Sequence, residues 1–250
     1  MMIGYMVNNV LPLRAGEVAR VYVVARRWGH GFWMVLATII VERVLDGIAI
    51  VVMLAVLVLV IPVPAYLQWG AALLLGINVV GVTGLVLLAM APGHTQRMLH
   101  RFTHRWPRLE RTTERVFIRF RDGLEGIRTP VHLVPLLSWT VAVWLMPIAG
   151  CWLVFRALDL ALPWTAAWAV LAFVGVGVSI PSAPGYIGVF HAAATIALGV
   201  FGVSAAEALA CALVLHAVQF VPVTVVGWIA LLREHVNLAD ATHAAPAAEG

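Results

Sequence analysis

The amino-acid sequence predicts an all-α integral membrane protein, a polytopic bundle of about six spanning helices with a re-entrant or broken-helix region. Of its 250 residues, 62% are hydrophobic and only 11% are charged, whereas a soluble domain averages about 25% charged residues. A water-soluble fold of this composition would lack the polar residues that must cover its surface. Long apolar segments, and arginine-rich stretches between them, are the other observations that support this fold class.

Four apolar segments are long enough to cross a membrane, because a helix needs about 20 residues to span about 30 Å of hydrocarbon. These segments are 33–61, 66–90, 131–155 and 204–232. The opening stretch 1–13 is apolar but too short to cross. We expect it to be either the end of a span that begins upstream or a re-entrant piece.

Two further apolar segments, 164–180 and 186–203, are only 17 and 18 residues long. Between them lies Pro181-Ser182-Ala183-Pro184-Gly185, which cannot continue a regular helix. The pair could form two short spans, or two broken half-helices that meet inside the membrane.

The basic residues predict the orientation of the bundle. All 16 of them are arginine, with four in 14–29 and nine in 91–130. Two spans separate these stretches, so both fall on one side, which the positive-inside rule makes the cytoplasm, together with the C-terminus after Arg233. The absence of lysine and the abundance of Ala, Val and Gly favour a GC-rich bacterial genome. We therefore expect a multi-pass protein of the bacterial inner membrane, with no nucleic-acid partner.

The chain is expected to form one membrane domain over 1–235, followed by a disordered Ala-rich tail over 236–250. Within the domain, the basic cytoplasmic loop 92–130 carries apolar residues at three- and four-residue steps, which is amphipathic-helix spacing interrupted by Pro107. Such a helix could lie on an anionic leaflet, with its arginines on lipid phosphates. The alternative is a cytoplasmic helical hairpin packed against the ends of the bundle.

A first group of charged residues follows Asn9 and Pro12. Glu17 is three residues from both Arg14 and Arg20, so on a helix one carboxylate could bridge two guanidinium groups. The alternative is an ordinary interfacial loop with solvated charges.

A second group, Glu42, Arg43 and Asp46, lies inside an apolar segment and shares one helix face. Residues 47–61 rise only about 22 Å, too little to cross alone, so part of the group must enter the membrane. Ionisable groups there are costly and usually face a cavity or a partner. Because the two groups carry opposite net charge, we expect them to form one polar site at the inner face. A purely structural ion-pair cluster is the alternative.

A third group is the stretch from Pro181 to His191, whose proline and glycine density frees backbone amides and carbonyls. At membrane depth this is tolerated only where the backbone is buried in protein or lines a cavity. The helix that follows Gly185 would point its positive end at that opening, a natural place for a phosphate. The alternative is a tight turn between two spans at the cytoplasmic surface.

The remaining polar residues of the spans give weaker signals. His132, Glu207, His216 and Gln219 are expected to make interhelical hydrogen bonds rather than a proton relay. Glu207 and His216 project from opposite faces of one helix and do not make a pair. The two cysteines, Cys151 and Cys211, predict neither a disulfide framework nor a thiolate metal site. No nucleotide-binding loop, zinc-protease helix or nucleophile elbow is present, so no catalytic residue, metal or cofactor is expected.

Three motifs in order resemble those of the flippase-like family, the family of the membrane domain of lysylphosphatidylglycerol synthases. They are Asn9-Val10-Leu11-Pro12-x-Arg14-x-Gly16-Glu17-x-x-Arg20, Glu42-Arg43-x-x-Asp46 and Pro181-x-x-Pro184-Gly185-x-x-Gly188. The resemblance covers about residues 4–232 and implies a multi-pass inner-membrane protein that moves a lipid or lipid-linked headgroup between leaflets. The chain departs from its relatives by starting almost on the first motif, by His191 where relatives often have an acid, and by lacking the aminoacyl-transferase domain.

The sequence therefore predicts a lipid flippase or lipid-linked headgroup transporter. Its partners would be membrane lipids, either an anionic or aminoacylated phospholipid or a lipid-linked sugar. A membrane-embedded enzyme with His191 or Asp46 as base, and a membrane subunit or scaffold for an aminoacyl- or glycosyl-transferring enzyme, are the alternatives. The residues expected to form the transport site are Asn9, Arg14, Gly16, Glu17, Arg20, Glu42, Arg43, Asp46, Pro181, Pro184, Gly185, Gly188 and His191.

Overall fold

The computed structural model describes residues 2–11, 15–29, 31–60, 65–90, 93, 101, 107–124, 130–179 and 182–234. Within these ranges every regular element is a helix and no strand occurs. The predicted all-α polytopic bundle is confirmed. Arg14, Pro181, and the tail 236–250 lie outside the described residues.

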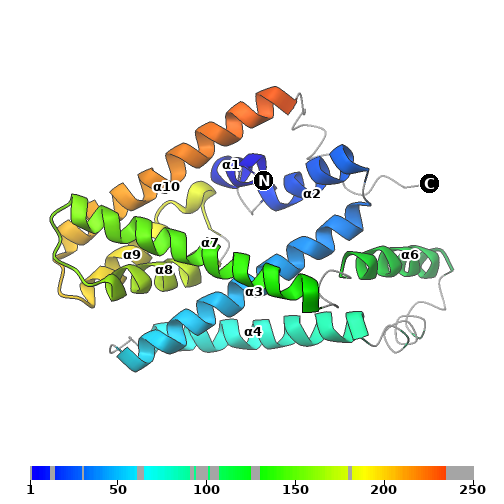
Figure 1. Cartoon of the computed structure of the whole chain (residues 1–250), viewed down its shortest axis with the longest axis horizontal. Helices are drawn as coiled ribbons and strands as arrows, with labels where there is room; N and C mark the ends of the chain where they lie inside the picture. The colour runs from blue at the N-terminus through cyan, green and yellow to red at the C-terminus, as the bar shows by residue number, and fades with distance from the viewer. Residues whose placement is uncertain are drawn as a thin grey trace.

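Four long helices run side by side along the longest dimension of the molecule (Figure 1). All four are long and apolar enough to cross a membrane, and they coincide with the four segments predicted from the sequence to within a few residues. Their outward side chains stay largely exposed, for example Leu59, Val80 and Met146. Such a continuous apolar exterior requires lipid rather than water around it. The four are α3 (Phe32–Val60), α4 (Ala65–Met90), α7 (Pro130–Ala157) and α10 (Ala205–Glu234).

The chain between α7 and α10 forms a helical hairpin made of α8 (Trp164–Ser179), the short helix η2 (Pro184–Tyr186) and α9 (Val189–Gly199). α8 leaves from the end of the molecule where α7 stops, and α9 returns to the same end, where α10 begins (Figure 1). At 16 and 11 residues the two helices rise only about 24 and 16 Å, less than the thickness of the hydrocarbon. Of the two arrangements left open by the sequence, the geometry is that of broken half-helices rather than two full spans.

The largest apolar core holds this hairpin in place. It joins α8 and α9 to the ends of α3, α7 and α10, and its fully buried members include Phe155, Phe173 and Leu198. The Trp168 indole N–H also donates to the carbonyl of Met53 on α3, at 3.0 Å. The tip of the hairpin, residues 182–188, therefore projects toward the middle of the molecule, while the opposite end of the hairpin is fixed by this core.

The first two helices, α1 (Met2–Val10) and α2 (Ala15–Trp28), pack through glycines. A Cβ added to Gly16 would collide with the Gly4 carbonyl, and one added to Gly227 of α10 would collide with Met6. Small residues let helix backbones approach this closely in membrane proteins. As a result α1 lies in the middle of the molecule, between α10 and α2 (Figure 1).

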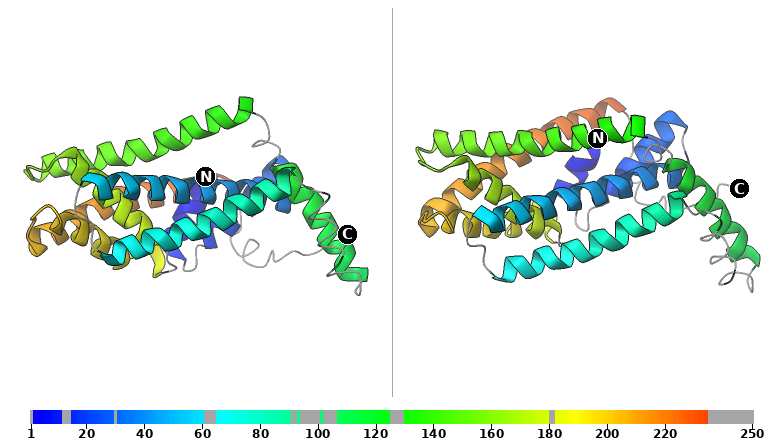
Figure 2. Two further views of the ribbon diagram at one scale, coloured as in Figure 1. Left: turned by 90° about the horizontal axis from the view of Figure 1, so that it is seen from below. Right: turned by 60° about the horizontal axis from the view of Figure 1, so that its bottom comes forward.

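The predicted amphipathic helix in the basic loop is present as α6 (Pro107–Gly123). Pro107 is its first residue, a position that proline favours. Phe120 and Leu124 pack in one apolar cluster with Ala37 and Val41 of α3, and Leu124 is fully buried there. The described part of the loop thus packs on the bundle, and Figure 2 shows it at the end of the molecule where α2 ends and α3 begins.

Candidate functional site

Two charged groups that are distant in sequence meet where α2 crosses α3. The Arg20 guanidinium on α2 forms a bidentate ion pair with the Glu42 carboxylate on α3. Nη1 donates to Oε1 at 2.9 Å, and Nη2 lies 2.7 Å from Oε2. This forked geometry is the strongest that an arginine makes with a carboxylate. The side chain of Arg20 is only 12% exposed. The predicted meeting of the two groups is therefore present, with Arg20 as its most buried member.

Arg43 lies at the centre of three carboxylates. Its Nη2 contacts Glu42 Oε1 at 2.7 Å and Asp46 Oδ2 at 3.0 Å. Its Nε lies 3.9 Å from Glu17 Oε1, too far for a hydrogen bond, and this buried Nε has no hydrogen-bond partner among the described residues. Glu17, Arg20, Glu42, Arg43 and Asp46 together are called the ion cluster below.

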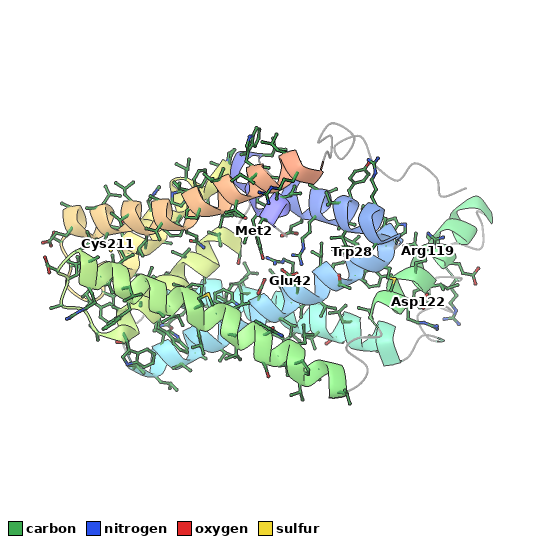
Figure 3. The ribbon with its side chains drawn as sticks, turned by 45° about the horizontal axis from the view of Figure 1, so that its top comes forward. Met2, Trp28, Glu42, Arg119, Asp122 and Cys211 are labelled. Atoms are coloured by element: carbon green, nitrogen blue, oxygen red, sulfur yellow. The ribbon has the colours of Figure 1, made fainter. Side chains whose placement is uncertain are left out.

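The ion cluster lies deep in the bundle rather than at its end. Asp46 is 14 residues before the end of α3 at Val60, or about 21 Å along the helix. Because the hydrocarbon is about 30 Å thick, a membrane that contains α3 also contains this part of the cluster. Figure 3 shows Glu42 near the middle of the molecule, while Trp28, Arg119 and Asp122 lie toward one end.

The charged side chains of the ion cluster are paired with one another but remain partly exposed. The side chains of Glu17, Glu42, Arg43 and Asp46 remain between 26% and 35% exposed. Charges that lose their hydration need close pairing and hydrogen bonds to their remaining polar atoms to repay that loss. Here each of the four keeps an accessible side, so a polar ligand could reach them without unfolding the bundle.

Two further helices border the ion cluster. The Trp144 indole N–H on α7 donates to Asp46 Oδ1 at 3.3 Å. Gly4 on α1 lies against Arg20, since a Cβ added to this glycine would stand 3.0 Å from Arg20 Cβ. The cluster is therefore bordered by α1, α2, α3 and α7.

The first motif also contributes uncharged residues that shape the site. The Gly16 N–H donates to Asn8 Oδ1 at 2.8 Å, which closes the connection between α1 and α2. The Asn9 side chain donates from Nδ2 to Thr224 Oγ1 on α10 at 2.8 Å. Asn9 and Gly16 thus position α1 and α2 instead of facing the ion cluster.

The third motif meets the first one at the hairpin tip. Gly185 has φ of +64°, a conformation open to glycine at little cost. A Cβ there would stand 2.6 Å from the Phe220 ring and 3.2 Å from the Asn9 carbonyl. His216 Nε2 on α10 lies 2.8 Å from the Gly185 carbonyl. The tip is therefore held between α1 and α10, and the predicted interhelical hydrogen bond of His216 is confirmed.

His191 lies beside this contact. Its Nδ1 accepts a hydrogen bond from the Gly188 N–H at 3.3 Å, at the start of α9. Its ring stands edge-on to the His216 ring, with centroids 4.7 Å apart. Pro184 starts η2 and is exposed. No direct contact between the hairpin tip and the ion cluster is found among the described residues, and α1 separates them.

Sequence reasoning missed four residues of these sites: Asn8, Trp144, Phe220 and Thr224. Asn8 and Thr224 are polar residues in apolar surroundings, a signal that could have identified them. Trp144 and Phe220 are ordinary residues of an apolar span, so only the fold reveals their role. Glu207 closes the start of α10 with Ser204 and, as predicted, makes no pair with His216.

The described residues contain no group of three side chains that could hold a metal ion. Cys151 and Cys211 are free and buried thiols. What the arrangement offers chemically is a set of guanidinium and carboxylate groups at membrane depth, with an irregular backbone turn on the other side of α1.

Most of the chain matches one known protein family. Residues 1–227 match the family model described as the lysylphosphatidylglycerol synthase TM region. Comparison with curated proteins and with solved structures gave no match.

Proposed function

The chain belongs to the lysylphosphatidylglycerol synthase TM-region family, and we propose that it moves a lipid or a lipid-linked headgroup between the leaflets of a bacterial inner membrane. The observation that carries this proposal is the ion cluster, whose charges lie at membrane depth and yet stay accessible. Ionisable side chains in such positions are expensive and mark pathways for polar substrates. The family supports a membrane protein with a role connected to lipids.

The two arginines of the cluster have different tasks in this proposal. Arg20 is the more buried and is fully engaged by Glu42, so it anchors α2 to α3. Arg43 shares one nitrogen between Glu42 and Asp46, and at 35% exposed it is the most accessible side chain of the ion cluster. A lipid phosphate could take the donors of Arg43, since guanidinium groups bind phosphate in a forked geometry.

The carboxylates of the ion cluster could bind the rest of the headgroup once a phosphate occupies Arg43. When a phosphate takes Arg43, Asp46 and Glu17 lose part of their positive counter-charge. They can then accept the ammonium group of an aminoacylated headgroup or the hydroxyl groups of a sugar. The acyl chains would stay in the surrounding lipid, against the apolar outer faces of α3, α4, α7 and α10.

A second candidate function follows from the family description, which names a synthase. In that function the chain is the membrane subunit or scaffold of a lipid-modifying enzyme, and the ion cluster holds the lipid for a partner without moving it. Asp46 and His191 are the groups that could act as a base in this setting.

Reconstitution separates the two functions. Purified protein in liposomes carrying headgroup-labelled lipid in both leaflets is treated with a membrane-impermeant quencher. We expect inner-leaflet label to become quenchable faster than in protein-free liposomes for at least one of three lipids: an anionic phospholipid, an aminoacylated phospholipid or a lipid-linked sugar. Binding of those lipids with no acceleration for any of them would reject transport and favour the subunit function.

A further inference from the structure

The hairpin tip carries two histidines whose hydrogen bonds fix their protons. A carbonyl oxygen only accepts, so the His216 Nε2 that lies 2.8 Å from the Gly185 carbonyl must carry a hydrogen. The Gly188 N–H only donates, so the Nδ1 of His191 that receives it must be free of hydrogen. In this geometry the Nδ1 lone pair of His191 is already used by the Gly188 N–H, while His216 keeps Nδ1 available for a second proton.

The two rings cannot both be charged at low cost. Their centroids are 4.7 Å apart, and like charges at that distance oppose each other. The titratable side chains described on the elements packed round the pair are Tyr5 of α1, Tyr186 of η2, Cys151 and Arg156 of α7, and Glu207, Cys211 and Arg233 of α10; α8 has none. None of these has a hydrogen bond or ion pair to either imidazole in the described chain.

Of the two rings, His216 is the better placed to accept the single proton, because its Nδ1 is not the acceptor of a backbone hydrogen bond as that of His191 is. Phe190 stacks on its ring with centroids 4.8 Å apart, and Phe220 lies tilted at 5.4 Å, so aromatic faces can stabilise an imidazolium. Protonation of His191 at Nδ1 would instead break its bond from Gly188. It would also place a positive charge at the start of α9, where the helix dipole opposes it.

We propose that His216 and His191 form a proton-binding site that takes up one proton from water on Nδ1 of His216 and thereby tightens the attachment of the hairpin tip to α10. The bond from Nε2 to the Gly185 carbonyl survives protonation and becomes charge-assisted, about twice as strong as the neutral bond. Gly185 also lies against the Asn9 carbonyl of α1. Proton uptake thus favours the arrangement in which hairpin, α1 and α10 are locked together.

Only the biological role of the proton site rests on the proposed function, in which a pH-sensitive tip would couple lipid movement to a proton. The site itself is independent of transport. It can be tested without any lipid substrate, so failure of the transport assay and failure of the proton site are separate results.

The first test is nitrogen NMR of the protein with ¹⁵N-labelled histidine in lipid nanodiscs. His191→Gln and His216→Gln variants assign the two rings. We expect both rings to be neutral with the hydrogen on Nε2 at high pH, and Nδ1 of His216 alone to gain a proton as the pH falls. Earlier protonation of His191, or protonation of both rings together, or of neither, would overturn the proposal.

The second test measures the attachment of the tip. Spin labels replace two exposed residues, Ile187 on the tip and Val218 on α10, after both native cysteines are changed to alanine. The distance distribution between the labels should narrow at low pH. His216→Gln, which still donates to the carbonyl but cannot titrate, should abolish this pH dependence, while the matched control Glu207→Gln on the same helix should keep it.

A distribution that is independent of pH in the parent protein would also overturn the proposal. If His216→Gln fails to fold, His191→Gln serves in its place. The proposal then requires the narrowing to persist, because the proton is bound by His216.

Discussion

At the scale of single residues, the two arginines of the ion cluster differ in burial and in how many carboxylates they contact. Arg20 gives two short contacts to one carboxylate and is nearly buried, whereas Arg43 divides its contacts among three partly exposed carboxylates. Removing one partner of a buried pair leaves an uncompensated charge, and that penalty exceeds the net strength of the pair. The stability of the protein should therefore depend more on Arg20 than on Arg43.

We predict that Arg20→Leu lowers the free energy of unfolding by about 3 kcal/mol, because Glu42 loses its forked partner and keeps only the single contact from Arg43. The double variant with Glu42→Leu should recover part of this loss, since an apolar pair can replace a buried ion pair. Unfolding in mixed micelles with increasing denaturing detergent measures both. Equal stability of the single variant and the parent would show that the forked pair does not anchor α2.

The charged residues of the site were predictable, and their partners were only partly so. Glu42, Arg43 and Asp46 share a helix face within an apolar segment, and their net negative charge demanded a positive group, which Arg20 supplies. The contact from Trp144 to Asp46 joins positions 98 residues apart, and nothing in the local pattern indicates it. The contact between His216 and Gly185 likewise depends on how the hairpin folds back.

At the scale of elements, glycine contacts fix the short helix α1. Its position decides the whole arrangement, because α1 separates the ion cluster from the hairpin tip and touches the elements of both. Gly227 of α10 lets α1 approach so closely that an added Cβ would overlap Met6 and meet the Met2 carbonyl at 2.6 Å. The packing of α1 is therefore sensitive to a single methyl group.

We predict that Gly227→Ala lowers the free energy of unfolding by about 1–3 kcal/mol, the usual cost of overpacking. Gly150→Ala on α7 is the matched control, since a Cβ there meets nothing within 4 Å. It should be neutral or stabilise by up to about 1 kcal/mol through helix propensity. The same denaturing-detergent titration compares them, and a control as damaging as Gly227→Ala would refute the role given to this contact.

The four long helices were predictable as elements because length and apolar composition alone define a spanning helix. The hairpin was harder, since two segments of 17 and 18 residues are compatible with spanning and with turning back. Packing decides between these, and the core around Phe155, Phe173 and Leu198 holds both short helices at one end. The loop helix α6 was predicted from its periodicity. Its packing against α3 was one of two arrangements that the sequence left open, the other being a helix on the lipid leaflet.

At the scale of the whole molecule, the bundle combines an apolar exterior with a partly exposed cluster of charged residues where α2 meets α3. α2, α6 and the start of α3 gather toward one end (Figure 1), and Arg26, Arg119 and Arg121 lie on these elements. By the positive-inside rule this end would face the cytoplasm. The ion cluster would then lie part-way into the membrane from that side, where a headgroup must pass.

The most direct test of this account compares lipid translocation by two variants that each remove one positive charge, Arg43→Gln inside the ion cluster and Arg26→Gln on the exposed end of α2. Both should fold. Because a hydrogen bond to a charged group contributes about 1.5–3 kcal/mol, we predict that Arg43→Gln slows translocation at least about tenfold. Arg26→Gln should translocate at the parent rate. Equal rates for the two variants would contradict the claim that the ion cluster handles the headgroup.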